Sequence, residues 1–184
     1  MGHMNDMTND TVLPRAVCEQ LCNALAREAD PQAALRQIDV ARHALLGAGL
    51  LTVNLDATRP GDPPDEIQLQ RGWTSNPEAY PVGGRKRKMP TPWTEQLLRR
   101  GEVFIGEGEG ALAAVFDDYS TIAALGWCSV INVPLFDAGR VRATFNVLGS
   151  QTRWAPTEVA GVRLLALLAT PHVLRLPCPT EVDS

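Results

Sequence analysis

Two runs of alternating apolar residues on either side of a glycine turn restrict the fold of this chain more than any other feature. Residues 129–135 and 140–148 carry an apolar side chain at nearly every second position, as strands with one buried face do. Asp137, Ala138 and Gly139 lie between the runs, and we interpret them as the loop of a hairpin. The chain is therefore expected to contain an antiparallel sheet built around this hairpin.

The loop length sets the register of the predicted hairpin. With a three-residue loop, Asn132 lies opposite Thr144, and Val130 lies opposite Asn146. Because side chains alternate between the faces of a strand, Asn132, Thr144 and Asn146 share one face with Arg142. The other face is apolar and should pack against helices. It consists of Ser129, Ile131, Val133, Leu135, Val141, Ala143, Phe145 and Val147.

Apolar residues at helical spacing occur near both ends of the chain. Residues 14–29 predict a first helix, and Asp30 followed by Pro31 predicts the capped start of a second helix that ends near Gly47. A closing helix is expected to open at Thr157. These helices are the natural cover for the apolar face of the hairpin.

The middle of the chain is less regular. Residues 50–56 and 67–71 alternate and predict a strand pair joined by a proline-rich turn. Residues 72–92 contain prolines, two adjacent glycines and the basic run RKRK, so we expect a long loop, which in a compact domain is usually functional. Short helices are predicted at 92–100, 111–116 and 119–125, with a short strand at 101–106.

Composition and charge limit the class of protein. The 184 residues fit one domain over 13–175, between tails at 1–12 and 176–184. With 17 Lys+Arg and 21 Asp+Glu the net charge is −4, so we expect no nucleic-acid partner. No apolar run approaches the roughly 20 residues of a membrane span, and the N-terminus lacks the layout of a secretory signal. The expectation is a cytoplasmic protein with no membrane partner.

The cysteines and histidines form no recognisable metal or nucleophile motif. No two lie at zinc-ligand spacing, so we expect no metal site. Cys18 and Cys22 lie four residues apart on a predicted helix, and we favour two buried small residues over a redox pair. The full set is Cys18, Cys22, Cys128, Cys178, His3, His43 and His172.

The order of the predicted elements resembles the GAF domain. The local match is SVINVPL at 129–135, the turn at Gly139 and the strand end NVL at 146–148, and the resemblance covers residues 14–174. The chain departs from the family at Arg142 and Ala143, where many members carry a glycine. The resemblance implies an α+β fold: a central antiparallel sheet with the N- and C-terminal helices on one face. Loops and short helices would cover a ligand pocket on the other face.

In GAF domains the ligand lies on the sheet face opposite the terminal helices. For this chain the resemblance implies a pocket lined by Asn132, Thr144 and Asn146 from the sheet, and by Trp73, Tyr80, Trp93, Phe116, Asp117, Asp118 and Tyr119 from above. Family ligands include cyclic nucleotides, bilins, haem, 2-oxo acids and aromatic compounds. The signature for cyclic nucleotides is absent, Cys128 lacks a chromophore-attachment context, and only His43 and His172 are available to haem. We therefore expect no cofactor.

Two sets of charged residues each have a functional and a structural interpretation. Gly83 and Gly84 would let the basic run swing inward, so that Arg85 and Lys86 contact an anionic ligand, whereas the simpler interpretation is a solvated loop. Asp117, Asp118 and Tyr119, with Lys86, are candidates for acid/base catalysis, whereas an aspartate before a helix is more commonly a cap.

The first functional hypothesis is a signalling sensor domain that holds a small anionic or aromatic metabolite between the sheet and residues 72–125, with a homodimer through the terminal helices. The alternatives are a small enzyme of the same fold that uses acid/base chemistry, and an interaction module without ligand. Free methionine-(R)-sulfoxide reductases have this fold and use cysteines in the variable segment. Residues 57–127 contain no cysteine, so that chemistry is not supported.

Overall fold

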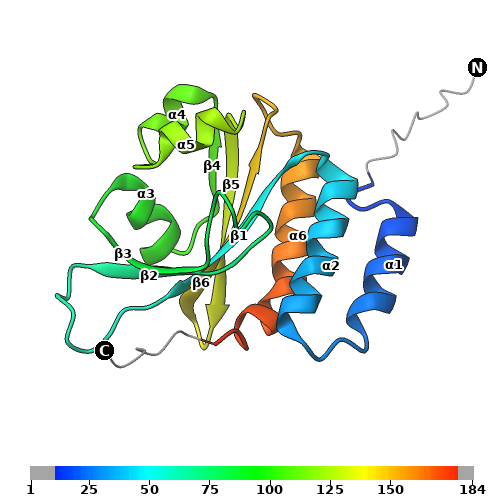
Figure 1. Cartoon of the computed structure of the whole chain (residues 1–184), viewed down its shortest axis with the longest axis horizontal. Coiled ribbons are helices and arrows are strands. Elements are labelled where there is room, and N and C mark those ends of the chain that lie inside the picture. Colours follow the sequence, from blue (N-terminus) through cyan, green and yellow to red (C-terminus); the bar gives the residue numbers. More distant parts are fainter. Residues whose placement is uncertain (1–10, 178–184) are drawn as a thin grey trace, which may run out of the picture.

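Three helices form a layer on one face of an antiparallel sheet (Figure 1). The structure is a computed structural model and describes residues 11–177, so most of both predicted tails, with His3 and Cys178, lies outside the described residues. The layer contains α1 (Arg15–Leu25), α2 (Pro31–Leu46) and α6 (Pro156–Val173). α2 and α6 lie side by side, and α1 lies on the far side of α2 from α6.

The boundaries of these helices follow local sequence signals. The Asp30 carboxylate accepts hydrogen bonds from the backbone N–H groups of Gln32 and Ala33, and α2 ends at Gly47, where φ is 75°. The predicted second helix is thereby confirmed. α1 ends at Leu25, four residues before the predicted end. No helix within residues 11–177 combines the length and the apolar character needed to cross a membrane.

The sheet has six antiparallel strands in the order β3-β2-β1-β6-β5-β4. The predicted α+β class, with helices on one face and short elements on the other, is confirmed. The strands are β1 (Gly49–Asp56), β2 (Ile67–Thr74), β3 (Gly83–Lys88), β4 (Phe104–Glu107), β5 (Ser129–Asp137) and β6 (Arg140–Gly149).

The predicted register of the β5–β6 hairpin is wrong by two residues. Asp137 pairs with Arg140, so the loop has two residues, and both Ala138 and Gly139 have positive φ (48° and 77°), as a type I′ turn requires. An extra residue, Arg142, then bulges from β6. Together these changes place Asn132 opposite Asn146 and Val130 opposite Leu148.

On the far side of the Arg142 bulge from the turn, a shift of two residues keeps the side chains on their predicted faces, because side chains alternate with a period of two. Val141, on the turn side of the bulge, pairs with Phe136 and is absent from the core under the helices, contrary to the prediction. The apolar face of the hairpin packs under α2 and α6, where Ile131 and Phe145 are fully buried with Leu35 and Leu165. The assignment of the two faces is therefore confirmed for residues 129–135 and 143–147, although the pairing is not.

The segment predicted as a loop over 72–92 contains a sixth strand. β2 continues to Thr74, and the basic run lies on β3, at the edge of the sheet. This strand carries no apolar residue, so it offers no alternating pattern to detect. Charged side chains suit an edge strand because they remain solvated and discourage pairing with another chain.

Short helices cover the face of the sheet opposite α2 and α6 (Figure 1). Thr91 caps α3 (Pro92–Thr94), which continues as a π-helical turn, η1 (Glu95–Arg99). α4 (Glu109–Ala113) and α5 (Tyr119–Ala124) follow β4. All three predicted short helices are present within a few residues. The apolar side chains of α4 and α5 form a second, smaller core around Leu112 and Ile122, whereas those of α3 and η1 pack with Leu69.

Candidate ligand site

A row of hydrogen-bonded side chains crosses the centre of the sheet on the face opposite the terminal helices. The indole Nε1 of Trp93 donates to Asn132 Oδ1 at 3.0 Å, and Asn132 Nδ2 donates to Asn146 Oδ1 at 2.8 Å. Asn146 Nδ2 donates in turn to the carbonyl oxygen of Thr52 at 3.3 Å. The register explains the row, because Asn132, Asn146 and Thr52 occupy directly opposed positions on β5, β6 and β1.

These side chains form the floor of a cavity between the sheet and its cover. The cavity has about 80 Å³ of space open to the centre of a water molecule, enough for a small ligand or several waters. Its wall includes seven residues that the sequence predicted for the site: Tyr80, Lys86, Trp93, Phe116, Asp118, Asn132 and Asn146.

The other predicted site residues lie outside the cavity wall. Trp73 is buried in the core under the terminal helices, and Thr144 is buried in the sheet beside the amide row. Tyr119 packs into the smaller core around Leu112. The side chain of Asp117 is 95% exposed.

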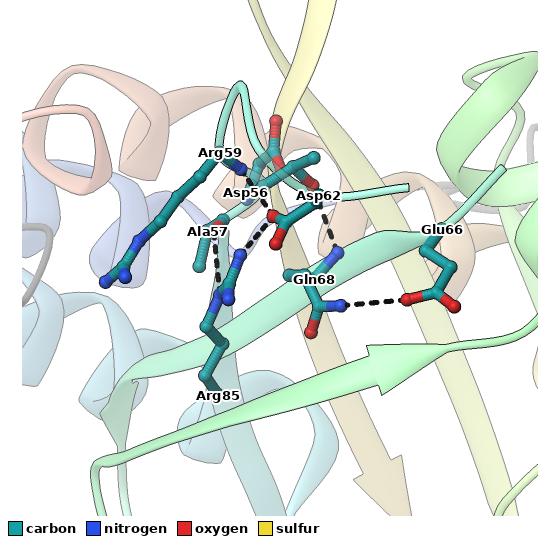
Figure 2. A network of polar contacts seen from close by, with 8 residues as sticks. Asp56, Ala57, Arg59, Asp62, Glu66, Gln68 and Arg85 are labelled. Atoms are coloured by element: carbon teal, nitrogen blue, oxygen red, sulfur yellow. Dashed lines mark hydrogen bonds and ion pairs between the residues drawn. The ribbon is translucent and has the colours of Figure 1, made fainter. Parts of the chain in front are cut away.

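Arg85 also lies away from the cavity. Its guanidinium donates to the carbonyl oxygen of Ala57 at 3.1 Å and pairs with Asp62, both in or next to the loop between β1 and β2 (Figure 2). Arg87 pairs with Glu66 at 2.9 Å on the same side. Alternation along β3 therefore sends the arginines to one face and Lys86 and Lys88 to the cavity.

Trp73 was expected in a loop above the sheet, but β2 continues to Thr74 and contains a bulge at Gly72 that sets the faces of Arg71 and Trp73. Val53 pairs with Trp73 and Asn54 pairs with Arg71, so Gly72 is an extra residue in β2. Without it Arg71 and Trp73 would share a face; with it Arg71 faces the cavity and Trp73 faces the helices. Gly72 itself fits because a Cβ there would lie 2.8 Å from Leu55 Cγ.

Three further residues of the cavity wall were not predicted, although their positions in alternating segments of the sequence indicate them. Thr52 and Asn54 occupy the polar positions of the alternating segment 50–56, on the same face as Asn146. Lys88 follows Lys86 by two positions in the basic run. Extending the same alternation to every strand of the sheet identifies all three.

Positive charge predominates around the cavity. Arg71, Lys86 and Lys88 line it, and among the residues that do so Asp118 is the one acid. Lys88 Nζ lies 5.7 Å from the centre of the Trp93 ring and 3.7 Å from the exposed carboxylate of Asp117. This balance favours an anionic or electron-rich ligand over a cationic one.

Arg71 and Tyr80 form a stacked pair at the side of the cavity. The guanidinium lies 4.8 Å from the centre of the Tyr80 ring, and its Nη1 donates to the carbonyl oxygen of Pro81 at 3.1 Å. Burial raises the pKa of Tyr80 to about 12, and the negative charge of Asp118 adds to this effect, while Arg71 opposes it. Burial lowers the pKa of Arg71, and Asp118 partly offsets the change.

Of the four residues considered for acid/base catalysis, the structure places two in the cavity wall. Asp118 and Lys86 line the cavity, whereas Asp117 and Tyr119 do not. Asp118 is the N-cap residue of α5, but its side chain accepts no capping hydrogen bond, so the interpretation of this aspartate as a side-chain cap is wrong. Among the described residues no His, Cys, Asp or Glu side chains cluster as a metal site.

Cys18 and Cys22 are exposed, in contrast to the predicted burial. α1 packs mainly on α2 and buries only Leu21 completely, so the face with both cysteines points to solvent. Cys128 is half-buried, and its thiol lies 3.0 Å from the carbonyl oxygen of Ser150.

Comparison with solved structures identifies the architecture. The chain superposes on the GAF domain of a phosphoenolpyruvate-protein phosphotransferase from Coxiella burnetii with a TM-score of 0.66 at 14% identity, over 86% of this chain and 91% of that one. The fold is GAF-like. The resemblance proposed from the sequence is thereby confirmed at the level of the fold.

Two further solved structures with a similar fold come from a sensor kinase and an enzyme. The GAF domain of a two-component sensor histidine kinase from Bacillus halodurans gives a TM-score of 0.56 at 13% identity, over 76% of this chain and 92% of that one. Free methionine-R-sulfoxide reductase from Neisseria meningitidis, in complex with its substrate, gives 0.57 at 18% identity, over 87% of each chain. No protein-family model matches the sequence, and no curated protein matches it significantly.

Proposed function

We propose that this GAF-like domain is a small-molecule sensor that binds a small anionic or aromatic metabolite in the cavity between the sheet and residues 72–125. The observation that carries the proposal is the cavity itself. Its floor is an amide row fixed by hydrogen bonds, its sides are aromatic, and its charged groups are mainly cationic. Fixed polar groups within an apolar wall are typical of sites that orient a small ligand.

The fold neighbours support a regulatory role. Structures with this fold include the GAF domain of a sensor histidine kinase and that of a phosphotransferase. The neighbour that is a reductase acts on free methionine sulfoxide, but residues 57–127 of this chain contain no cysteine. Binding without turnover is therefore the function that the site supports best.

A thermal-shift screen against nucleotides, 2-oxo acids, aromatic acids and amino-acid derivatives tests the proposal. A ligand at 100 times its Kd should stabilise the domain by roughly 2.7 kcal/mol and raise Tm by a few degrees. β3 supplies a matched pair of variants: Lys86→Gln alters the cavity, whereas Arg85→Gln alters the opposite face. A hit that is weakened by the first variant alone supports a site in the cavity, and the absence of any hit contradicts the proposal.

We propose further that α6 mediates a homodimer through the terminal helices. The helix is apolar on both sides: Val162 and Leu165 are buried, while Leu164, Leu167 and Leu174 are exposed. The exposed leucines repeat at intervals of three and seven, the spacing of a helix–helix seam. Light scattering on wild type and Leu167→Glu checks the oligomeric state, and a monomeric wild type contradicts this arrangement.

A further inference from the structure

Two buried hydrogen-bond donors in the cavity wall have no partner. They are the Nε of Arg71 and the hydroxyl of Tyr80. A buried donor left unpaired destabilises the folded state, and such groups are uncommon in folded proteins. The other unpaired buried groups in residues 11–177 belong to residues outside this cavity wall, so these two form a local pair.

We propose that Arg71 and Tyr80 bind the carboxylate of a small organic acid that carries an apolar or aromatic body. This inference rests on the proposed function and names the ligand class of the same cavity. A carboxylate has two oxygens that each accept hydrogen bonds, which matches one guanidinium N–H and one hydroxyl on neighbouring side chains.

The local structure holds the two donors in place before any ligand arrives. The Gly72 bulge turns Arg71 toward the cavity, and the bond from Nη1 to Pro81 with the stacking on Tyr80 fixes the guanidinium plane. Gly83 lies opposite Arg71 on β3, and a Cβ built there would touch nothing within 4 Å. The approach to Arg71 from this side is therefore open.

The protonation of the pair favours an anion. With a pKa of about 12, the Tyr80 hydroxyl keeps its proton at neutral pH and acts as a donor. The Asp118 carboxylate lies near Tyr80 and raises its pKa, although the hydroxyl has no hydrogen-bond partner within residues 11–177. The negative charge of Asp118 opposes a doubly charged group such as a phosphate more than a singly charged carboxylate.

The rest of the cavity wall indicates the size and polarity of the group that carries the carboxylate. Phe116, Ile122, Val130 and Leu148 give an apolar lining on the side formed by α5 and the central strands. The space open to the centre of a water molecule, about 80 Å³, favours a small body. An aryl or short alkyl acid satisfies both conditions.

Binding of benzoate, phenylacetate and hexanoate, each compared with its primary amide, tests the inference. Titrations are followed by NMR through the side-chain Nε–H signal of Arg71. We expect the acids to bind at least tenfold more tightly than the amides and to shift that signal. Hydrogen bonds to charged groups contribute about 1.5–3 kcal/mol, so Arg71→Gln should weaken the acids at least tenfold. Phenyl phosphate is expected to bind more weakly than benzoate.

Two variants with opposite expected effects on affinity for the acids distinguish a loss of binding from a loss of folding. Tyr80→Phe removes a hydroxyl that has no protein partner, so it should keep Tm and weaken the acids several-fold while leaving the amides unchanged. Asp118→Asn removes the opposing charge and should tighten the acids severalfold. Asp117→Asn, the exposed neighbour, is the matched control and should change affinity less than twofold.

Several results overturn the inference. They are equal binding of acids and amides, tighter binding of phenyl phosphate, failure of all three acids, or acid affinity unaffected by Tyr80→Phe and Asp118→Asn. If neutral aromatic compounds or anions without a carboxylate from the wider screen still bind in the cavity, the proposed sensor function stands and only the carboxylate assignment fails. If no compound of either set binds, both fail.

Discussion

Asn132 and Asn146 face each other across the β5–β6 ladder and share a 2.8 Å hydrogen bond between their side-chain amides, both almost fully buried. The bond consumes one donor and one acceptor and fixes how each amide is oriented. Trp93 and Thr52 satisfy the amides at the two ends of the row. The floor of the cavity is thus rigid and polar before any ligand binds.

Replacing Asn132 should therefore destabilise the domain more than its volume suggests. Asn132→Ala leaves both the Trp93 N–H and the Asn146 carbonyl oxygen without their partner, and each unpaired buried group costs about 1–3 kcal/mol. Urea unfolding measures the loss. Asn54→Ala, on the same face but half-buried and with no side-chain hydrogen bond to the residues that the structure describes, is the control and should cost under about 1 kcal/mol. Equal losses for the two variants would contradict the role of the row.

The placement of Trp73 in the helix-side core gives a second prediction. Trp73→Ala should lower the free energy of unfolding by about 3–5 kcal/mol, as expected for a large aromatic removed from a core. Ligand affinity of the folded fraction should stay within twofold of wild type, because Trp73 does not line the cavity. Trp93→Phe, a change in the wall itself, is the comparison and should alter affinity.

The bulge at Gly72 can be tested directly. A Cβ at this position would lie 2.8 Å from Leu55 Cγ and 2.9 Å from Leu55 Cδ1, so Gly72→Ala should force Leu55 to move and destabilise the domain by about 1–3 kcal/mol. The double variant Gly72→Ala with Leu55→Ala should recover part of that loss, measured by urea unfolding. A Gly72→Ala protein as stable as wild type would show that the bulge tolerates a side chain.

Strand alternation, helical spacing and the family resemblance together predicted most of the fold and seven residues of the cavity wall. Alternation assigned Asn132 and Asn146 to the cavity face correctly even though the loop length was misjudged, because an even shift preserves the face. Trp73 was assigned to the site from the resemblance, within a segment expected to be a loop; it lies instead in β2, after a bulge at Gly72 that no sequence pattern marks.

The basic run shows a different limit. Arg85 and Lys86 differ in the face they occupy, and that difference follows only once β3 is known to be a strand. Strands without an apolar face leave no periodic signal, since their pairing rests on backbone hydrogen bonds. The ion pair of Arg85 with Asp62 joins segments 23 residues apart, which spacing alone does not reveal.

His172 makes stability depend on pH. Burial lowers its pKa, Arg175 lowers it further, and Glu28 opposes both; its Nδ1 is buried without a partner. The folded state therefore binds the proton less tightly than the unfolded chain, so the stability present above pH 6.5 should fall as the pH drops below it. Urea unfolding between pH 5 and 8 measures the slope. His172→Gln should flatten it, whereas Glu28→Gln, which removes a charge that raises the pKa, should steepen it.

The exposed cysteines of α1 give a final prediction on reactivity. The neighbouring thiol of Cys22, one helical turn away, raises the pKa of Cys18, so its thiolate fraction is low. Cys22→Ala should lower that pKa and speed alkylation of Cys18 at pH 8 severalfold, measured by mass spectrometry of the folded protein. Half-buried Cys128 is the internal reference and should react at the same rate in both proteins, because it lies far along the chain in a separate contact with Ser150. A rate for Cys18 that does not change would show that the two thiols do not interact in solution.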